Sequence, residues 1–297
     1  MQMSCICICT LWLVGVTLML DVILETIIDT LKLIPFLFLT YLAMEYLEHK
    51  TGEKTQKLVR KAGKFGPVIG GALGVVPQCG FSAAASNLYT GRVITPGTLI
   101  AIYLSTSDEM LPILISEQAP IRTIVFILFT KAVIGMTAGF VIDLFYSSHR
   151  EESHHINEIC EHEHCHCEEG SIFRSALLHT AHITLFILII TFVLNLLFFF
   201  VGEDILANLM LGRKILGPVI AGIVGLIPNC AGSVVITQLY LEGVINTGAM
   251  LAGLLTGTGV GLLVLFRINY DKKENIKILG LLYFVGVLAG ITAGVVI

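Results

Sequence analysis

The chain contains one apolar segment twice, and this duplication restricts the possible folds more than any other feature. Residues 66–115 align without a gap with residues 217–266, at a constant offset of 151 positions. Each copy has a proline, an amide residue and a cysteine near its centre, Pro-Gln-Cys at 77–79 and Pro-Asn-Cys at 228–230. Paired apolar units with such a break predict two homologous halves whose broken helices meet inside one bundle.

The composition predicts that both halves cross a lipid bilayer. Hydrophobic residues make up 55% of the 297 positions and charged residues only 13%, about half of the charged share in soluble domains. The apolar runs reach the roughly 20 residues that a membrane-crossing helix needs, and their continuity disfavours a β-barrel. We therefore expect an all-α polytopic membrane protein whose first partner is the lipid bilayer, with no nucleic acid as a partner.

The charges and the repeat divide the chain into four parts. Residues 1–20 form an extra apolar segment, which is either part of an additional membrane helix or precedes a translation start at Met19. The two transmembrane repeats cover 21–146 and 173–297, and a linker rich in His, Cys and Glu joins them at 147–172. The eight cysteines lack the spacing of a secreted disulfide framework, so we expect free thiols.

The broken segments decide the topology. If residues 66–90 and 217–241 each cross the bilayer once, the repeats are parallel; if each turns back at Pro77 or Pro228 as a re-entrant hairpin, the repeats are inverted. Lys and Arg divide thirteen to three between the two sides in both arrangements, so their distribution does not decide. About twelve residues on each side of the break are too few to span the bilayer, and we favour inverted repeats.

Polar residues inside the apolar repeats are candidates for an ion site. Proline leaves a carbonyl unpaired on the preceding turn, and amide and thiol side chains follow it in both repeats. Asp108 and Glu109 interrupt the apolar run 93–115, where carboxylates are costly to bury and therefore functional by default; alternatively they lie at a helix end in the interface. The candidate transport residues are Gln78, Cys79, Ser82, Asn87, Ser105, Ser107, Asp108 and Glu109 in the first repeat and Asn229, Cys230, Ser233 and Gln238 in the second.

These residue types leave the identity of the metal open. Carboxylate, amide and carbonyl oxygens suit a hard cation such as Mn²⁺, whereas two thiols suit softer ions. The candidate metal ligands are Asp108, Glu109, Cys79 and Cys230. Lys131, the deepest cation in the sequence, could pair with a carboxylate when no metal is bound.

The linker holds a second group of metal-binding side chains. Imidazole, thiol and carboxylate at this density bind metals such as Zn²⁺, Ni²⁺ or Cu²⁺, and such a tract collects or senses metal without forming one defined site. The residues are His154, His155, Cys160, His162, His164, Cys165, His166 and Cys167. Residues 162–166 also match the zincin pattern H-E-x-x-H, but that pattern indicates a protease only on an ordered helix with an apolar face.

Four stretches of the chain carry a family resemblance. They are D-T-L-K-L-I-P-F-L-F-L-T-Y-L-A-M-E at 29–45, G-x-x-P-Q-C-G-F-S at 74–82, S-T-S-D-E at 105–109 and the second P-N-C at 228–230. Together they resemble the bacterial manganese-transporter or ten-helix heavy-metal exporter family, also labelled arsenic efflux proteins. The resemblance covers nearly the whole chain from about Met19. It implies metal export through the cytoplasmic membrane, and its ten helices would count each broken segment as two.

The combined expectation is a multi-pass protein of the cell membrane that is not an enzyme. It would export a divalent metal cation, with Mn²⁺ favoured, as a secondary active transporter. Because the sequence has no P-loop motif, the energy would come from proton exchange or from the membrane potential. The alternatives are an efflux permease for arsenite or another heavy metal, and a metal-responsive membrane sensor. No cofactor is expected beside the transported ion, and a homodimer stays an open option.

Overall fold

The structure is a computed structural model that describes residues 65–76, 79–107, 110–146, 172–201 and 215–296, together with 23–42 except for positions 25, 29, 33, 36 and 40. Helices and short turns make up all of these residues, without a strand, which confirms the predicted all-α class. Five helical segments within them are long and apolar enough to cross a membrane: Pro96–Ser116, Ile121–Phe145, Ala176–Leu196, Thr247–Ile268 and Lys272–Val295.

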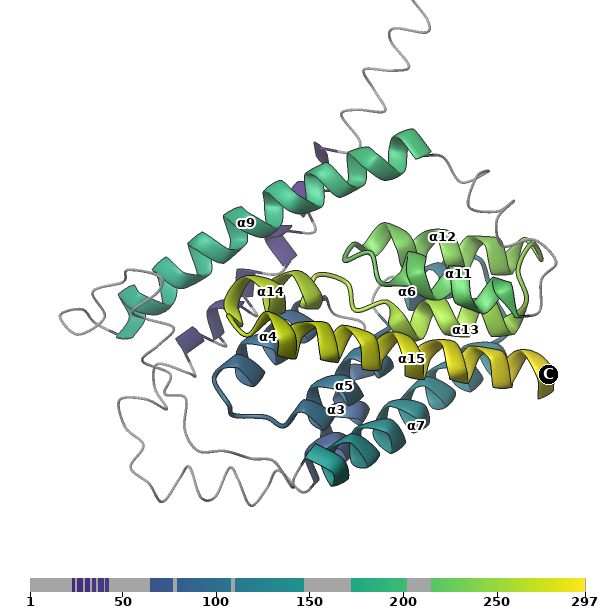
Figure 1. Cartoon of the computed structure of the whole chain (residues 1–297). Coiled ribbons are helices and arrows are strands. Elements are labelled where there is room, and N and C mark those ends of the chain that lie inside the picture. Colours follow the sequence, from purple (N-terminus) through teal and green to yellow (C-terminus); the bar gives the residue numbers. More distant parts are fainter. Residues whose placement is uncertain are drawn as a thin grey trace, which may run out of the picture.

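Within the described residues, five helices of one half correspond in order to five helices of the other. From the second helix on, each helix of the first half begins 151 residues before its counterpart, at 79 and 230, 96 and 247, 110 and 261, and 121 and 272. The helices are α3 (Gly66–Gly74), α4 (Cys79–Thr90), α5 (Pro96–Ser105), α6 (Met110–Ser116) and α7 (Ile121–Tyr146), then α11 (Leu216–Gly225), α12 (Cys230–Leu241), α13 (Thr247–Thr256), α14 (Gly261–Ile268) and α15 (Lys272–Val296) (Figure 1). The helix α9 (Ile172–Val201) precedes α11 and begins the second half.

Each half is broken at two places. The first break lies at the predicted prolines, between α3 and α4 and between α11 and α12. The second break separates α5 from α6 and α13 from α14, inside runs that hydropathy alone reads as single spans. At the second break the backbone leaves the helical region, with ψ 132° at Thr106 and 104° at Gly257. Both kinds of break interrupt the backbone hydrogen-bond ladder in the interior of an apolar protein.

The helices pack in the same order within each half, and the second helix of each half packs against the other half. Within each half, the first helix packs on the third and the third on the fifth, as α3 on α5 on α7 and as α11 on α13 on α15. Between the halves, α4 packs on α14 and α12 packs on α6. The second helix of each half therefore covers the fourth helix of the other, so the two halves form one body around α5 and α13.

The helices α5 and α13 form the buried centre, and the long helices surround them. Every residue from Gly97 to Ser105 and from Gly248 to Thr256 is buried. By contrast α7, α9 and α15 expose large apolar side chains, such as Phe129, Leu185 and Phe284. Exposed apolar surface on long helices suits contact with lipid. The protein is thus a multi-pass membrane protein with an interior that does not touch lipid.

The long helices α7 and α15 run in opposite directions (Figure 1). Thr123 near the start of α7 and Gly294 near the end of α15 line one pocket. At the other end of the bundle, Asp143 near the end of α7 accepts a hydrogen bond from Thr95. Arg92, three residues before Thr95, is bonded to Glu274 in the first turn of α15.

Candidate functional site

A buried lysine connects the two halves in the interior. The side chain of Lys131, on α7, is only 1% exposed. Among the described residues, it is the only charged side chain that is buried. Its Nζ donates a hydrogen bond to the carbonyl of Thr106, at the C-terminal end of α5. A second hydrogen bond, of 2.8 Å, goes to the carbonyl of Leu254 in the last turn of α13. Helix C-termini carry negative partial charge, so these two helix ends together form a place that favours a cation.

The hydroxyl groups at the second breaks mostly bond to nearby backbone. Ser105 Oγ donates to the Ala101 carbonyl at 2.6 Å, and Ser107 Oγ donates to the Ser105 carbonyl at 3.1 Å. Both predicted residues are buried. In the second half, the counterpart of Ser107 is Thr258, whose buried Oγ1 has no hydrogen-bond partner among the described residues. An unpaired buried hydroxyl costs about 1–3 kcal/mol, which makes Thr258 a further candidate for contact with an ion.

The two predicted serines of the first breaks lie against the second break of the second half. A Cβ added to Gly257 would lie 3.1 Å from Ser233 Oγ, and one added to Gly261 would lie 2.9 Å from Ser82 Cβ. Ser86, one turn after Ser82, donates to the Gly261 carbonyl at 2.7 Å. The structure therefore brings Ser82 and Ser233 to one short segment, 257–261, although 151 residues separate the two serines.

Asn229 belongs to a chain of amide and hydroxyl groups that the sequence analysis did not foresee. Its Nδ2 donates to Asn195 Oδ1 at 2.5 Å, and Asn195 Nδ2 donates to Thr26 Oγ1 at 2.8 Å. Asn229 is the N-cap of α12, but its side chain makes no cap hydrogen bond. These hydrogen bonds connect the first break of the second half to α9 and to the helical residues around Thr26. The available signal was Asn195 itself, an amide inside a long apolar helix.

Asn87 and Gln238 occupy the same position in the two repeats, and each keeps an unpaired polar atom. Asn87 Oδ1 accepts a hydrogen bond from Tyr41 at 3.3 Å, whereas Asn87 Nδ2 and Gln238 Oε1 are buried and find no partner in the part of the chain that the structure describes. Cys230 is a half-buried cysteine at the first residue of α12. These three predicted residues are placed on α4 and α12, the helices that cross to the other half.

Several predicted residues lie outside the described part of the chain. They are Gln78, Asp108, Glu109 and all eight metal-binding residues of the linker; Cys79 begins α4, but its side chain is not described. Within the described residues, no three His, Cys, Asp or Glu side chains come close enough to hold a metal ion. The carboxylates predicted to bind the metal directly follow Ser107 in the sequence.

The comparison with known families identifies the chain. A family described as "Putative, 10TM heavy-metal exporter" matches residues 19–200. The chain belongs to this family. No curated protein and no solved structure matches it. Membership supports metal efflux in general and a multi-pass membrane protein, which agrees with the resemblance carried by the first break and by residues 105–109.

Proposed function

We propose that this chain is a secondary active transporter that exports a divalent metal cation, with Mn²⁺ favoured, across the cytoplasmic membrane. The observation that carries the proposal is the Lys131 ammonium, which is held by carbonyls at the C-terminal ends of α5 and α13. These groups belong to different halves, and they already stabilise one cation in the interior. A metal ion that reaches this place competes with the ammonium for the same negative helix ends.

The proposed arrangement of the halves is a pair of inverted repeats. It is supported by the opposite directions of α7 and α15 and by the reciprocal packing of α4 on α14 and of α12 on α6. In transporters built this way, the ion site lies near the bilayer midplane, where broken helices from both repeats meet. That position corresponds here to the carbonyls under Lys131 and to the segment 257–261.

Asp108 and Glu109 are the proposed ligands that select a hard cation. They follow the carbonyl of Thr106, and a carboxylate together with carbonyl and hydroxyl oxygens suits Mn²⁺. Lys131 then balances the carboxylate charge when no metal is bound. Binding of a divalent cation, release of the ammonium and movement of a proton would be linked, which is the basis for coupling export to a proton gradient.

A softer ion is the second candidate, and one observation favours it. Cys230 lies at the N-terminal end of α12, and a helix N-terminus stabilises a thiolate. Cys79 holds the equivalent position at the start of α4. Two thiolates would suit arsenite or another thiophilic metal better than Mn²⁺.

Export assays on single-residue variants distinguish the two candidates. A metal-sensitive bacterial host that expresses the chain is challenged in parallel with Mn²⁺, Zn²⁺, Cd²⁺ and arsenite, and cell metal content is measured. For a manganese exporter, Asp108→Asn is expected to lower Mn²⁺ export at least about tenfold, because charged ligands contribute more than about 1.4 kcal/mol, whereas Cys79→Ser keeps most of it. The opposite ranking, with resistance to arsenite alone, would assign the paired cysteines as the site.

Deleting the linker residues 149–168 separates transport from sensing. A metal-collecting loop is not part of the central site, so the deletion is expected to raise the metal concentration needed for half-maximal export and to leave the maximal rate within about twofold. The measurement is Mn²⁺ flux in proteoliposomes over a range of concentrations. Complete loss of the response to metal in the folded deletion variant would instead support the sensor.

A further inference from the structure

Three side chains join the two halves at one end of the bundle, and we call them the latch. Arg92, in the turn after α4, donates two hydrogen bonds to the Glu274 carboxylate of α15, at 2.9 and 3.1 Å. Tyr89 of α4 donates to the same carboxylate at 2.5 Å, and the Arg92 guanidinium lies over the Tyr89 ring. Hydrogen bonding to Glu274 raises the pKa of Arg92 above its usual range, so the arginine stays charged.

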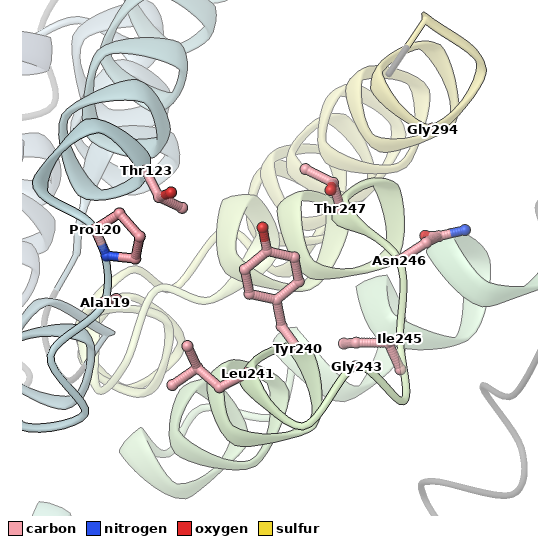
Figure 2. A pocket seen from close by; sticks show the side chains of 10 residues that line it. All are labelled: Ala119, Pro120, Thr123, Tyr240, Leu241, Gly243, Ile245, Asn246, Thr247 and Gly294. Carbon is pink, nitrogen blue, oxygen red and sulfur yellow. The ribbon is translucent and has the colours of Figure 1, made fainter.

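The equivalent place in the repeat is an open pocket with a volume of about 560 Å³. At the offset of 151 residues, Tyr89 and Arg92 correspond to Tyr240 and Gly243, and Glu274 corresponds to Thr123. All three of these counterparts line the pocket, as Figure 2 shows. Since Gly243 and Thr123 carry no charge, they cannot form the ion pair that closes the other end.

The turn geometry is the same at both ends, so the side chains make the difference. Arg92 has a φ of 58° and Gly243 a φ of 75°, the left-handed conformation that the turn after α4 and α12 requires. An L-residue other than glycine rarely adopts it, yet an arginine stands at the first of the two positions. The bidentate contact with Glu274 compensates for that backbone cost.

Latch and pocket lie at opposite ends of the membrane helices. Thr123 is at the pocket, and Asp143, further along α7, bonds Thr95, which follows Arg92 by three residues. The 20 residues between Thr123 and Asp143 span about 30 Å as an α-helix, which is the thickness of the hydrocarbon core. One side of the membrane therefore meets a pocket between the halves, and the other side meets the ion pair.

We propose that the latch is the gate that closes one end of the transport path, and that the pocket is the open mouth of the same path on the other side of the membrane. This inference rests on the proposed function. Lys131 follows Thr123 by eight residues on α7, so the pocket opens about 12 Å along the helix from the central cation place. A transported ion passes the pocket in this conformation and passes the latch once Arg92 and Glu274 have separated.

Hydrogen–deuterium exchange of the full-length protein in lipid nanodiscs tests the gate, with Glu274→Gln as the first variant. Loss of the ion pair is expected to raise amide exchange in residues 91–95 and 270–276 about fivefold and to lower it in 119–123 and 243–247, because opening one end closes the other. Arg92→Gln tests the same contact from the other half. The double variant Arg92→Glu with Glu274→Arg is expected to restore the original pattern.

Two controls make the result specific. Lys277→Gln removes an exposed charge one turn further along α15 and is expected to leave all four segments unchanged. If Glu274→Gln raises exchange only around the latch, with the pocket segments unaltered, the ion pair is a local contact and the gate is refuted. The same conclusion follows if Lys277→Gln reproduces the full pattern.

Building the latch into the second repeat gives the converse test. Thr123→Glu together with Gly243→Arg places the same ion pair beside Tyr240, at the equivalent positions. Exchange in 119–123 and 243–247 is expected to fall and metal flux in proteoliposomes to drop about fivefold; unchanged exchange and flux would overturn the proposal. Because the exchange measurement needs no transported ion, it is independent of whether Mn²⁺ is the right substrate.

Discussion

Replacing Lys131 by leucine is expected to reduce metal export at least about tenfold. Leucine is the residue that stands at the equivalent position of the second half, where Leu282 is 0% exposed and packs in the core with Leu104 and Leu255. A leucine side chain can therefore be buried at this position of the long helix. It removes the ammonium from the carbonyls of Thr106 and Leu254, and each carbonyl left unpaired costs about 1–3 kcal/mol.

The loss separates two roles of the lysine. If the ammonium balances the charge of Asp108 or Glu109 between transport events, Lys131→Leu blocks the return of the empty carrier, and Lys131→Arg retains part of the flux because it keeps the charge. Manganese uptake into inverted proteoliposomes measures the rate, and thermal unfolding in detergent measures stability alongside. Full transport by the leucine variant would contradict the central cation place, whereas equal loss in both variants at unchanged stability would indicate that the geometry of the ammonium matters more than its charge.

The all-α class of the fold could be predicted from the composition. Hydropathy missed the second breaks, however, because it averages over a long window in which the apolar neighbours outweigh the few polar residues at 105–109. In the structure, the hydroxyls of Ser105, Thr106 and Ser107 bond to nearby carbonyls. Asp108 and Glu109 directly follow these residues in the sequence, and serine and threonine that bond to their own helix weaken its regular hydrogen bonding. Glycine and threonine do the same at 256–260 in the second half.

The candidate site was predictable in part. The duplication pointed to Ser82 and Ser233, and the structure places both against segment 257–261. The pairing of Lys131 with a carboxylate stays a prediction, because Asp108 and Glu109 lie outside the described residues. The bond of Lys131 to Leu254 joins residues 123 positions apart. No local pattern encodes such a contact, because it depends on how α7 of one half packs against α13 of the other. The contact of Arg92 with Glu274 could not be predicted for the same reason, because it joins residues 182 positions apart.

Adding one methyl group at Gly139 is expected to destabilise the protein by about 1–3 kcal/mol. Gly139 of α7 faces Gly97 of α5, and a Cβ on Gly139 would lie 2.5 Å from the Gly97 carbonyl oxygen and 2.9 Å from Ala101 Cβ. Backbone atoms cannot move aside as a flexible side chain does, so α5 and α7 must separate. Small residues that allow this approach are the usual basis of helix association in membranes.

The matched control is Gly280→Ala on α15, where a Cβ would meet nothing within 4 Å. Alanine raises helix propensity by up to about 1 kcal/mol relative to glycine, so this variant is expected to be neutral or more stable. Gly290→Ala repeats the test in the second half, because a Cβ there would lie 2.5 Å from the Gly248 carbonyl oxygen. Unfolding midpoints of the full chain in detergent rank the three variants, and a Gly139→Ala midpoint equal to that of Gly280→Ala would refute the tight packing.

The effect of Gly139→Ala on export follows from the same geometry. The helix α5 carries the Thr106 carbonyl, and α7 carries the Lys131 ammonium that bonds to it. Lys131 lies eight residues before Gly139, so a wedge between the two helices acts about 12 Å from the cation place. Separation of the helices lengthens that hydrogen bond, and export is expected to fall together with stability in Gly139→Ala but to stay unchanged in Gly280→Ala.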